Sequence, residues 1–360
     1  MFVSGFFDIS NNLFLPQMTA PKSTRNRTAD HLKGVAVILM IQVHIMELFA
    51  RQDIFDSIAG KLSLFLGGPP AAPVFMAVMG YFIAKSSKNF LQSFIRGVKI
   101  IALGFLLNIG LNIHLFIKIA TGDFELDPLP YLFGVDILFL AGLSIIALSA
   151  VKLIKSYQLI VSSIVIIFIF VIQFVLESGS ANFSENHLLA FFYGEGTWWS
   201  YFPLIPWFAY PLTGFIFYKM EGNLKVFIQK YLVLIFIVYA AVVIVFFEYG
   251  MMISSDLESY YHHDFMFFIY AVFFLIAWSA LSLLTTQKIN NVALNYIEWL
   301  GKNVTSAYVI QWLVIGNIAT ALFKTQSLIA ILLWFACILV ITSAGVWLWS
   351  KFIRPVKTII

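Results

Sequence analysis

Charged residues and cysteine are both scarce in this sequence. Only 11% of its 360 residues are charged, whereas a soluble domain of this size carries roughly 25%. So little polar surface cannot solvate a globule, which excludes a soluble cytosolic enzyme, a disordered chain and a fibrous repeat. The single cysteine, Cys337, lies in an apolar run, which excludes a disulfide framework and a thiolate metal cluster. A cleaved signal peptide is not expected, because residues 1–8 lack a basic region.

Long apolar runs take up most of the chain instead. Hydrophobic residues make up 61% of it, and the mean hydropathy is +0.91. A helix needs roughly 20 apolar residues to cross about 30 Å of hydrocarbon. The candidate spans are 32–50, 70–84, 98–116, 131–151, 157–176, 201–218, 231–249, 265–285, 303–322 and 328–350. We therefore predict an all-α integral membrane protein with about ten transmembrane helices, and a short amphipathic helix at 290–301 on the inner interface.

The distribution of Lys and Arg predicts the orientation of these spans. Basic residues beside membrane spans stay on the cytoplasmic side. With a cytoplasmic N-terminus, the only ones of the 22 basic residues that fall outside are Arg51, Lys61, Lys118 and Lys324. The expected parts are a cytoplasmic segment (1–30), a transmembrane domain (31–354) and a cytoplasmic tail (355–360). We expect a multi-pass protein of the cytoplasmic (inner) membrane with both termini inside, so the net charge of +4 does not indicate nucleic acid as a partner.

Several polar side chains nevertheless fall inside the predicted spans. At about 1.5 Å of rise per residue, they gather between the midplane and the outer leaflet from four different helices. They are His44, Asn108, Asn112, Asp136, Gln311 and Asn317. Ionisable groups inside a membrane are costly and usually mark a site or a pathway. We therefore predict a functional site at this depth.

The polar residues of the first span also have a structural interpretation. His44, Glu47 and Arg51 share one helix face, because they are three and seven residues apart. His44 could be a packing histidine that is hydrogen-bonded to a neighbouring carbonyl. Glu47 and Arg51 could form an ion pair at the outer interface. Both interpretations stay open from the sequence.

The other polar residues have structural alternatives as well. Asn108 and Asn112 could join neighbouring helices, which is a common use of Asn in membrane bundles. Asp136 could occupy the first turn of a helix, where the helix dipole favours an acid. Residues 262–264, His-His-Asp, have no obvious further ligand, so we expect no metal.

Four motifs, in order along the chain, resemble those of a family of membrane enzymes. They are Arg27, Asp30, Lys33 and Gly34 at the start of the first span; residues 71–80; residues 202–207 with Gly214; and residues 300–308. The set resembles the transmembrane acyltransferases related to heparan-α-glucosaminide N-acetyltransferase. It is more distantly similar to the acyltransferase-3 family, which places a histidine near the outer end of its first span. The sequence departs from the pattern at Lys33, where Arg is commoner, at Gln311, where many relatives have His, and in lacking the long luminal domain of the human-type enzyme.

The resemblance implies transfer of an acyl group, with acetyl expected, from cytoplasmic acyl-CoA to an acceptor on the other side of the membrane. His44 would act as a general base or form an acyl-imidazole, and Asp136 or Glu47 would orient its ring and stabilise the imidazolium. The residues expected to contact substrate are Glu47, Asn108, Asn112, Trp207, Tyr210 and Gln311. Of these, Trp207 and Tyr210 would line the acceptor entrance or, alternatively, belong to the aromatic belt at the membrane interface. The phosphates of coenzyme A need clustered cations, and the expected cofactor-binding residues are Arg25, Arg27, Lys33, Arg96 and Lys99.

The expected partners follow from this function. They are the lipid bilayer, acetyl-CoA or another acyl-CoA as co-substrate, and an extracytoplasmic acceptor such as a saccharide. The sequence leaves the oligomeric state open, with a homodimer as one alternative. A proton-coupled small-molecule transporter is the alternative function, because a buried His, Asp and Glu can also relay protons. The inverted repeats of many transporters are not evident in this sequence.

Overall fold

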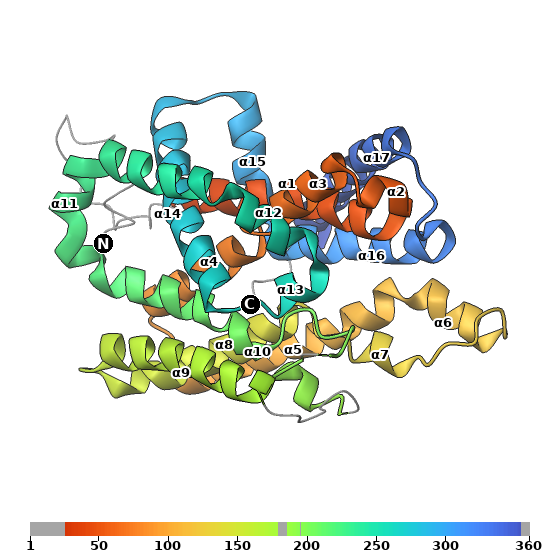
Figure 1. Cartoon of the computed structure of the whole chain (residues 1–360), viewed down its shortest axis with the longest axis horizontal. Helices are drawn as coiled ribbons and strands as arrows, with labels where there is room; N and C mark the ends of the chain where they lie inside the picture. The colour runs from red at the N-terminus through yellow and green to blue at the C-terminus, as the bar shows by residue number, and fades with distance from the viewer. Residues whose placement is uncertain (1–25, 179–185, 195, 354–360) are drawn as a thin grey trace.

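The computed structural model describes residues 26–178, 186–194 and 196–353, which fold into a bundle of helices (Figure 1). Within these ranges no β-strand forms, and β-type pairing is limited to two isolated bridges, Ala50–Gln326 and Val135–Ser200. The prediction of an all-α, multi-pass membrane architecture is confirmed.

The helices vary widely in length. The first half of the chain contains α1 (Arg27–Phe49), α2 (Gln52–Phe55), α3 (Ile58–Gly67), α4 (Ala72–Lys85), α5 (Phe90–Leu111), α6 (Ile113–Ala120), α7 (Leu129–Leu132), α8 (Ile137–Val151) and α9 (Gln158–Ser178). The second half contains α10 (Leu204–Trp207), α11 (Ala209–Val245), α12 (Phe247–Ser255), α13 (Leu257–Tyr261), α14 (Phe265–Lys288), α15 (Val292–Lys302), α16 (Val304–Leu322) and α17 (Leu328–Leu348). Short helical turns are formed by Lys152–Ile154, Leu189–Phe191 and Trp349–Ile353.

Polar cap residues fix where the long helices begin. The side chain of Asn26 accepts a hydrogen bond from the backbone N–H of Ala29 at the start of α1. Asp264 caps α14 in the same way, and Asn89 opens α5 with a full capping box. These side chains satisfy backbone donors that have no partner in the first turn of a helix. Short polar residues between apolar runs therefore set the helix boundaries.

Eight helical segments are long and apolar enough to cross a membrane within the described ranges, and a ninth span results if the bent pair Lys230–Val245 and Phe247–Ser255 counts as one. This is fewer than the ten spans expected. The predicted span 201–218 is not one continuous helix, because α10 ends at Trp207 and α11 begins at Ala209. The first half of α11 also carries Lys219 and Glu221, and Figure 1 shows α11 turning back at the edge of the molecule.

Neighbouring helices run in alternating directions. The start of α1 meets the end of α14, where the Thr28 and Thr286 hydroxyls lie 2.6 Å apart. The other end of α1 meets the loop before α17, where the N–H of Arg51 donates to the Gln326 carbonyl. This alternation is the arrangement that successive membrane crossings require. We call the end of the bundle at Thr28 the basic end.

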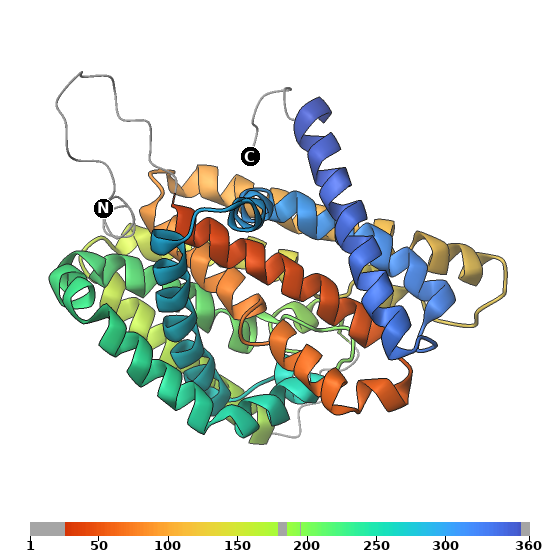
Figure 2. The ribbon, with the colours of Figure 1, turned by 90° about the horizontal axis from the view of Figure 1, so that it is seen from above.

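Helix α1 forms the centre of the bundle. It packs against α3, α4, α14, α15, α16 and α17, and Figure 2 shows it, in red, crossing the middle of the molecule. One apolar cluster, including Leu32, Ala36 and Met40, joins it to α4, α11 and α14, and a second, including Ile41, joins it to α16 and α17. Side chains on several faces of α1 are therefore enclosed by protein.

The short helix expected at 290–301 is present as α15, and it packs across the first turns of α1. Two glycines allow the close crossing. A Cβ atom on Gly34 would lie 1.9 Å from the Ile297 carbonyl oxygen, and one on Gly301 would lie 1.8 Å from that of Asp30. Any side chain at either position would therefore push α15 away from the basic end of α1.

Candidate active site

His44 lies in the second half of α1 and is only 7% exposed. Its ring packs against that of Trp312 from α16, with ring centroids 4.0 Å apart and the ring planes tilted by 32°. The Nδ1 atom is buried and has no hydrogen-bond partner among the described residues. A packing histidine whose Nδ1 is bonded to a carbonyl is therefore not what the structure shows. The ring therefore packs against Trp312 while its Nδ1 atom stays unengaged in the described part of the protein.

A small cavity of about 20 Å³ lies beside His44. Glu47, three residues further along α1, lines it together with Ser254 of α12 and Tyr260 of α13. The Ser254 Oγ and Tyr260 Oη atoms are buried and have no hydrogen-bond partner among the described residues. Buried polar groups are nearly always hydrogen-bonded, and a space of this size holds about one water molecule. The cavity thus combines an imidazole, a carboxyl group and two unengaged hydroxyls.

Ser254 and Tyr260 were not among the residues predicted from the sequence. They lie between two long apolar runs, in a polar segment whose sequence indicates an extracytoplasmic loop. No local pattern relates them to His44, which is more than 200 positions away. Only the packing of α12 against α3, with α13 following α12, brings them to the cavity beside the second half of α1.

Glu47 does not form the ion pair with Arg51 that the helix spacing allows. Arg51 instead pairs with Asp53, at 2.9 Å. The cation whose charge acts on Glu47 is Lys324, and the amino group of Lys324 lies over the ring of Phe55. Glu47 is therefore free to face the cavity.

Asp136 acts as the N-cap of α8, where it accepts a hydrogen bond from the Leu138 N–H at 2.7 Å. Its second carboxylate oxygen accepts a hydrogen bond from the Tyr308 hydroxyl at 3.0 Å. Tyr308 lies one helical turn before Trp312, the residue that packs against His44. Asp136 is therefore a helix cap, as the structural alternative predicts. It is linked to His44 only indirectly, through Tyr308 and Trp312 of α16.

Asn108 and Asn112 hold the loop that precedes α8. The side-chain amide of Asn108 donates to the carbonyls of Leu132 and Gly134, each at 2.9 Å. That of Asn112 donates to the carbonyl of Tyr131 and to that of Asn108 itself. Their N–H groups are engaged within the protein, so their role in this structure is to position Asp136 and its loop.

Gln311 is 1% exposed, and neither its amide nitrogen nor its amide oxygen has a partner among the described residues. It lies on the same helix stripe as Ala307 and Ile315, which pack against the second half of α1. A buried amide without partners is costly. Gln311 is therefore a candidate for contact with a bound substrate, next to Trp312 in sequence.

Trp207 and Tyr210 are fully buried and do not line an open entrance. The indole N–H of Trp207 donates to the Tyr261 carbonyl at 2.8 Å, and the Tyr210 hydroxyl lies 2.9 Å from Nε2 of His263. The Tyr261 side chain is part of the cavity lining. The two residues thus form a second layer that supports the cavity wall.

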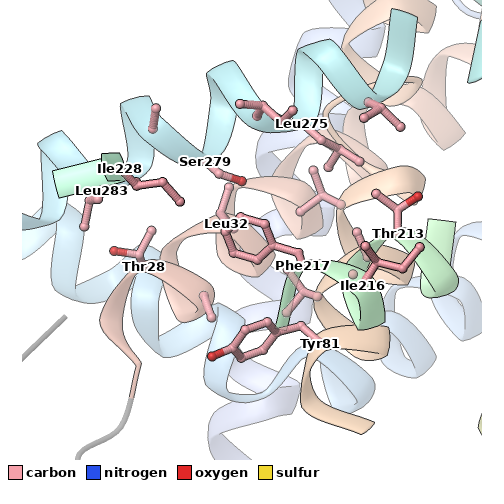
Figure 3. Close-up of a pocket in the computed structure, with 18 of the residues that line it drawn as sticks. Thr28, Leu32, Tyr81, Thr213, Ile216, Phe217, Ile228, Leu275, Ser279 and Leu283 are labelled. Carbon is pink, nitrogen blue, oxygen red and sulfur yellow. The ribbon is translucent and has the colours of Figure 1, made fainter. Parts of the chain in front are cut away.

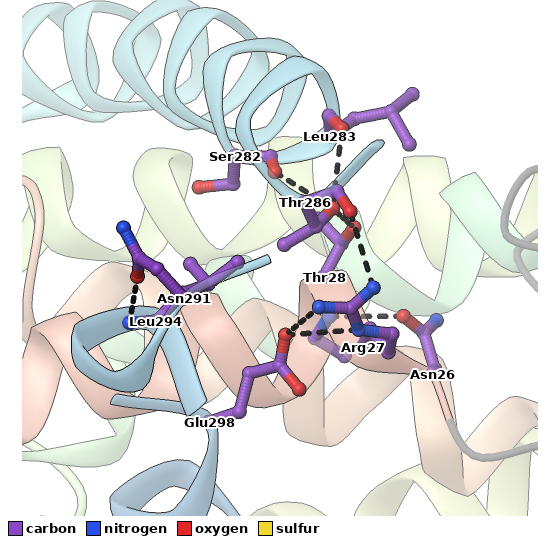
Figure 4. Close-up of polar contacts among 10 residues, drawn as sticks. Asn26, Arg27, Thr28, Ser282, Leu283, Thr286, Asn291, Leu294 and Glu298 are labelled. Carbon is purple, nitrogen blue, oxygen red and sulfur yellow. Dashed lines mark hydrogen bonds and ion pairs between the residues drawn. The ribbon is translucent and has the colours of Figure 1, made fainter. Parts of the chain in front are cut away.

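The cations expected to bind phosphate are partly neutralised at the basic end (Figure 4). Arg27 forms an ion pair with Glu298 of α15 at 2.9 Å, and Lys33 forms one with Asp30 at 2.9 Å. Arg25 lies outside the described residues. The sequence motif contains Asp30, but nothing in it reveals Glu298, whose distance along the chain from Arg27 is 271 residues.

The two remaining expected cations belong to another helix. Arg96 and Lys99 lie in the first half of α5, which packs mainly against α8 and α16. Lys99 is exposed, whereas Arg96 is half-buried, and its Nε atom has no partner among the described residues. The structure therefore divides the expected phosphate site between α1 and α5.

Comparison with known families places the chain among acyltransferases. A family model for an acyltransferase domain, that of acyltransferase family 3, matches residues 26–350. No curated protein and no solved structure gives a significant match. The match confirms the expected acyltransferase superfamily through the more distant of the two resemblances, and it favours an enzyme over a transporter. The chain belongs to the acyltransferase-3 family and is a multi-pass membrane acyltransferase.

Proposed function

We propose that the protein transfers an acyl group, expected to be acetyl, from cytoplasmic acyl-CoA to an acceptor on the extracytoplasmic side, with His44 as the general base. One observation carries this proposal. In a chain of an acyltransferase family, the His44 ring packs against Trp312 beside a polar cavity and has a nitrogen without a partner among the described residues. The resemblance to the heparan-α-glucosaminide N-acetyltransferase group supports the choice of donor and direction.

The chemistry needs only the groups around the cavity. A neutral imidazole takes the proton from an acceptor hydroxyl or amine as that group attacks the thioester carbonyl. The carbon–sulfur bond breaks, a carbon–oxygen or carbon–nitrogen bond forms, and the proton passes to the thiolate of coenzyme A. The hydroxyls of Ser254 and Tyr260 would donate hydrogen bonds to the developing oxyanion. Glu47 would stabilise the imidazolium.

An acyl-imidazole route is compatible with the same geometry. His44 would then attack the thioester first, and the acceptor would attack the acyl-imidazole in a second step. The transient acyl-enzyme would carry the group across while the donor and the acceptor bind in turn. Trapping an acylated His44 by rapid quenching and peptide mass spectrometry would separate this route from direct transfer.

The basic end supplies the phosphate contacts in this proposal. Phosphates favour charge-assisted hydrogen bonds from Arg and Lys. Arg27 and Lys33 already have carboxylate partners, Glu298 and Asp30. The phosphates of coenzyme A would therefore either displace the carboxylate from each cation or bind the cation together with that carboxylate.

The experiment that tests this function measures thiol release from acetyl-CoA by the purified protein in detergent. We expect His44→Gln to lower the rate by roughly 10² to 10⁴-fold, the range typical for a lost general base. His114→Gln is the matched control, because His114 contacts Asn317 at the α6–α16 junction and lies away from the cavity. Wild-type rates in His44→Gln would contradict the assignment of the base. A wild-type protein that releases no thiol from any acyl-CoA would contradict the donor.

A further inference from the structure

A second and larger cavity lies toward the basic end of the bundle. Its volume is about 320 Å³, within the range of about 300–1,000 Å³ that is typical of ligand pockets. Helices α1, α4, α11 and α14 enclose it, and in Figure 3 Leu275 and Ser279 of α14 face Leu32, Tyr81 and Phe217. A pocket of this size and lining can hold a ligand.

The lining of this cavity selects hydrocarbon. Most of the lining side chains are aliphatic or aromatic, and the polar ones are Asn26, Thr28, Tyr81, Thr213 and Ser279. The hydroxyls of Thr28, Tyr81 and Thr213 are already hydrogen-bonded within the protein. An apolar cavity stays dry and takes up apolar molecules. A sugar or a water cluster would find too few polar partners there.

The cavity opens at the surface of the bundle. Phe217 and Met220 of α11 line it and are 42% and 39% exposed. Exposed apolar side chains of a membrane protein face lipid tails at the depth of the hydrocarbon, and we expect this opening to do so. An acyl chain of the surrounding leaflet is therefore the hydrocarbon that can reach the cavity directly.

One end of the cavity suits an anionic headgroup. Asn26 lines it, is 6% exposed, and its Nδ2 atom has no hydrogen-bond partner among the described residues. The neighbouring Arg27 keeps 44% of its side chain exposed while it pairs with Glu298. An amide donor next to a guanidinium is a suitable pair of partners for a phosphate. The polar partners thus lie at the basic end, and the apolar lining extends from there into the bundle.

We propose that this cavity binds one acyl chain of an anionic phospholipid, with the phosphate at Asn26 and Arg27 and the chain between α1, α4, α11 and α14. With the predicted orientation, the lipid comes from the cytoplasmic leaflet. The two cavities share no lining residue: on α1 their linings lie within 26–32 and within 40–47, and on α4 they come as near as Val74 and Ala72. Fully buried Ala36 lies between the two linings on α1. Lipid binding here goes beyond the proposed transfer reaction and does not depend on it.

The test uses the full chain in nanodiscs containing phosphatidylglycerol with a photoreactive diazirine in one acyl chain. After irradiation, peptide mass spectrometry maps the cross-links. We expect saturable labelling of residues 275–283 and 213–220, reduced at least tenfold by excess unlabelled phosphatidylglycerol. Ala280→Phe fills the cavity and should reduce this labelling at least tenfold. Leu281→Phe is the matched control, because Leu281 is the next residue on α14, is 38% exposed and is not part of the lining.

The same experiment contains the results that would overturn the proposal. They are equal labelling in Ala280→Phe and the wild type, labelling that unlabelled phosphatidylglycerol does not reduce, or labelling that only a long-chain acyl-CoA reduces. Ser279→Leu provides a smaller filling if Ala280→Phe does not yield a monodisperse protein. Thiol release is measured on the same samples, so that a failure of lipid binding and a failure of acyl transfer are recorded separately.

Discussion

Three polar atoms at the His44 cavity have no hydrogen-bond partner among the described residues: His44 Nδ1, Ser254 Oγ and Tyr260 Oη. Each buried polar group without a partner costs about 1–3 kcal/mol of stability. Natural proteins accept such costs mainly at functional sites. The grouping of three of them around one small cavity therefore supports a substrate site more strongly than the presence of His44 alone.

Replacing Tyr260 by Phe tests whether its hydroxyl contributes to the reaction. The substitution removes one oxygen that has no partner in the described part of the protein, so we expect unchanged or slightly higher thermal stability. We expect kcat for acyl transfer to fall by about 10²-fold, as for the loss of one oxyanion donor. Tyr270→Phe is the matched control, because the Tyr270 hydroxyl is also buried without a partner in the described ranges but is not part of the cavity lining. Equal kcat values in both variants would contradict this role.

His263 makes stability depend on pH. Burial lowers the pKa of His263 to about 4, although its hydrogen bond to the Tyr260 carbonyl and the charge of Asp264 act in the opposite direction. Between pH 6.5 and pH 4 the unfolded chain binds a proton that the folded chain excludes. The contribution of His263 to the free energy of unfolding is therefore fully present above about pH 6.5, and it decreases as the pH falls from 6.5 to 4.

We expect a loss of about 2 kcal/mol between pH 7.5 and pH 5 from this residue, at 1.36 kcal/mol per pKa unit. His263→Gln should remove most of this pH dependence. Thermal unfolding midpoints of the wild type and the variant in detergent at the two pH values check it. Parallel decreases in the two proteins would show that His263 is not the group responsible.

At the scale of single helices, α1 and α15 show what the sequence could predict and what it could not. The apolar run at 32–50 predicts α1, which the structure begins earlier, after its cap Asn26, and the amphipathic pattern at 290–301 predicts α15. The contact between them depends on Gly34 and Gly301, whose sequence positions do not reveal which carbonyl each one approaches. The pairing of Arg27 with Glu298 follows from this crossing, so it could not be predicted either.

The α1–α15 contact allows a test of the role of Arg27. Arg27→Met leaves the buried Glu298 without its cation, whereas the double variant Arg27→Met, Glu298→Met removes both charges. If Arg27 binds the donor phosphates, the KM for acyl-CoA should rise about 10-fold or more in both variants, as expected for a lost charge-assisted hydrogen bond. If Arg27 only neutralises Glu298, the double variant should restore the wild-type KM. Steady-state kinetics with acetyl-CoA separates these results.

At the scale of the whole molecule, the hydropathy of the sequence predicts the class of fold correctly and the number of spans less accurately. The predicted span 201–218 is interrupted in the structure, where Pro203 and Pro206 accompany a break in the helix and charged residues follow in α11. The segment that contains Ser254 and Tyr260 reads as a loop, although it closes the His44 cavity. Apolar length is a local property, whereas this closure depends on contacts between distant parts of the chain.

The orientation of the bundle can be tested with single cysteines. In a Cys337→Ser background, cysteines replace the exposed residues Lys85 and Lys288 at the predicted cytoplasmic side, and Asp53 and Asp123 at the other. In right-side-out vesicles we expect a membrane-impermeant maleimide to label positions 53 and 123 only. Labelling of positions 85 and 288 instead would reverse the topology and place the basic end outside.

The central claim is that acyl transfer takes place at His44. A cryo-EM structure of the full chain with a non-hydrolysable acetyl-CoA analogue measures this most directly. We expect the thioester carbon to lie in the His44 cavity, with room for one acceptor atom between it and the imidazole ring. We expect the phosphates to lie at the basic end. If the phosphates lie at the basic end while the thioester carbon stays among Thr28, Leu32 and Tyr81, His44 is not the base and the account is wrong.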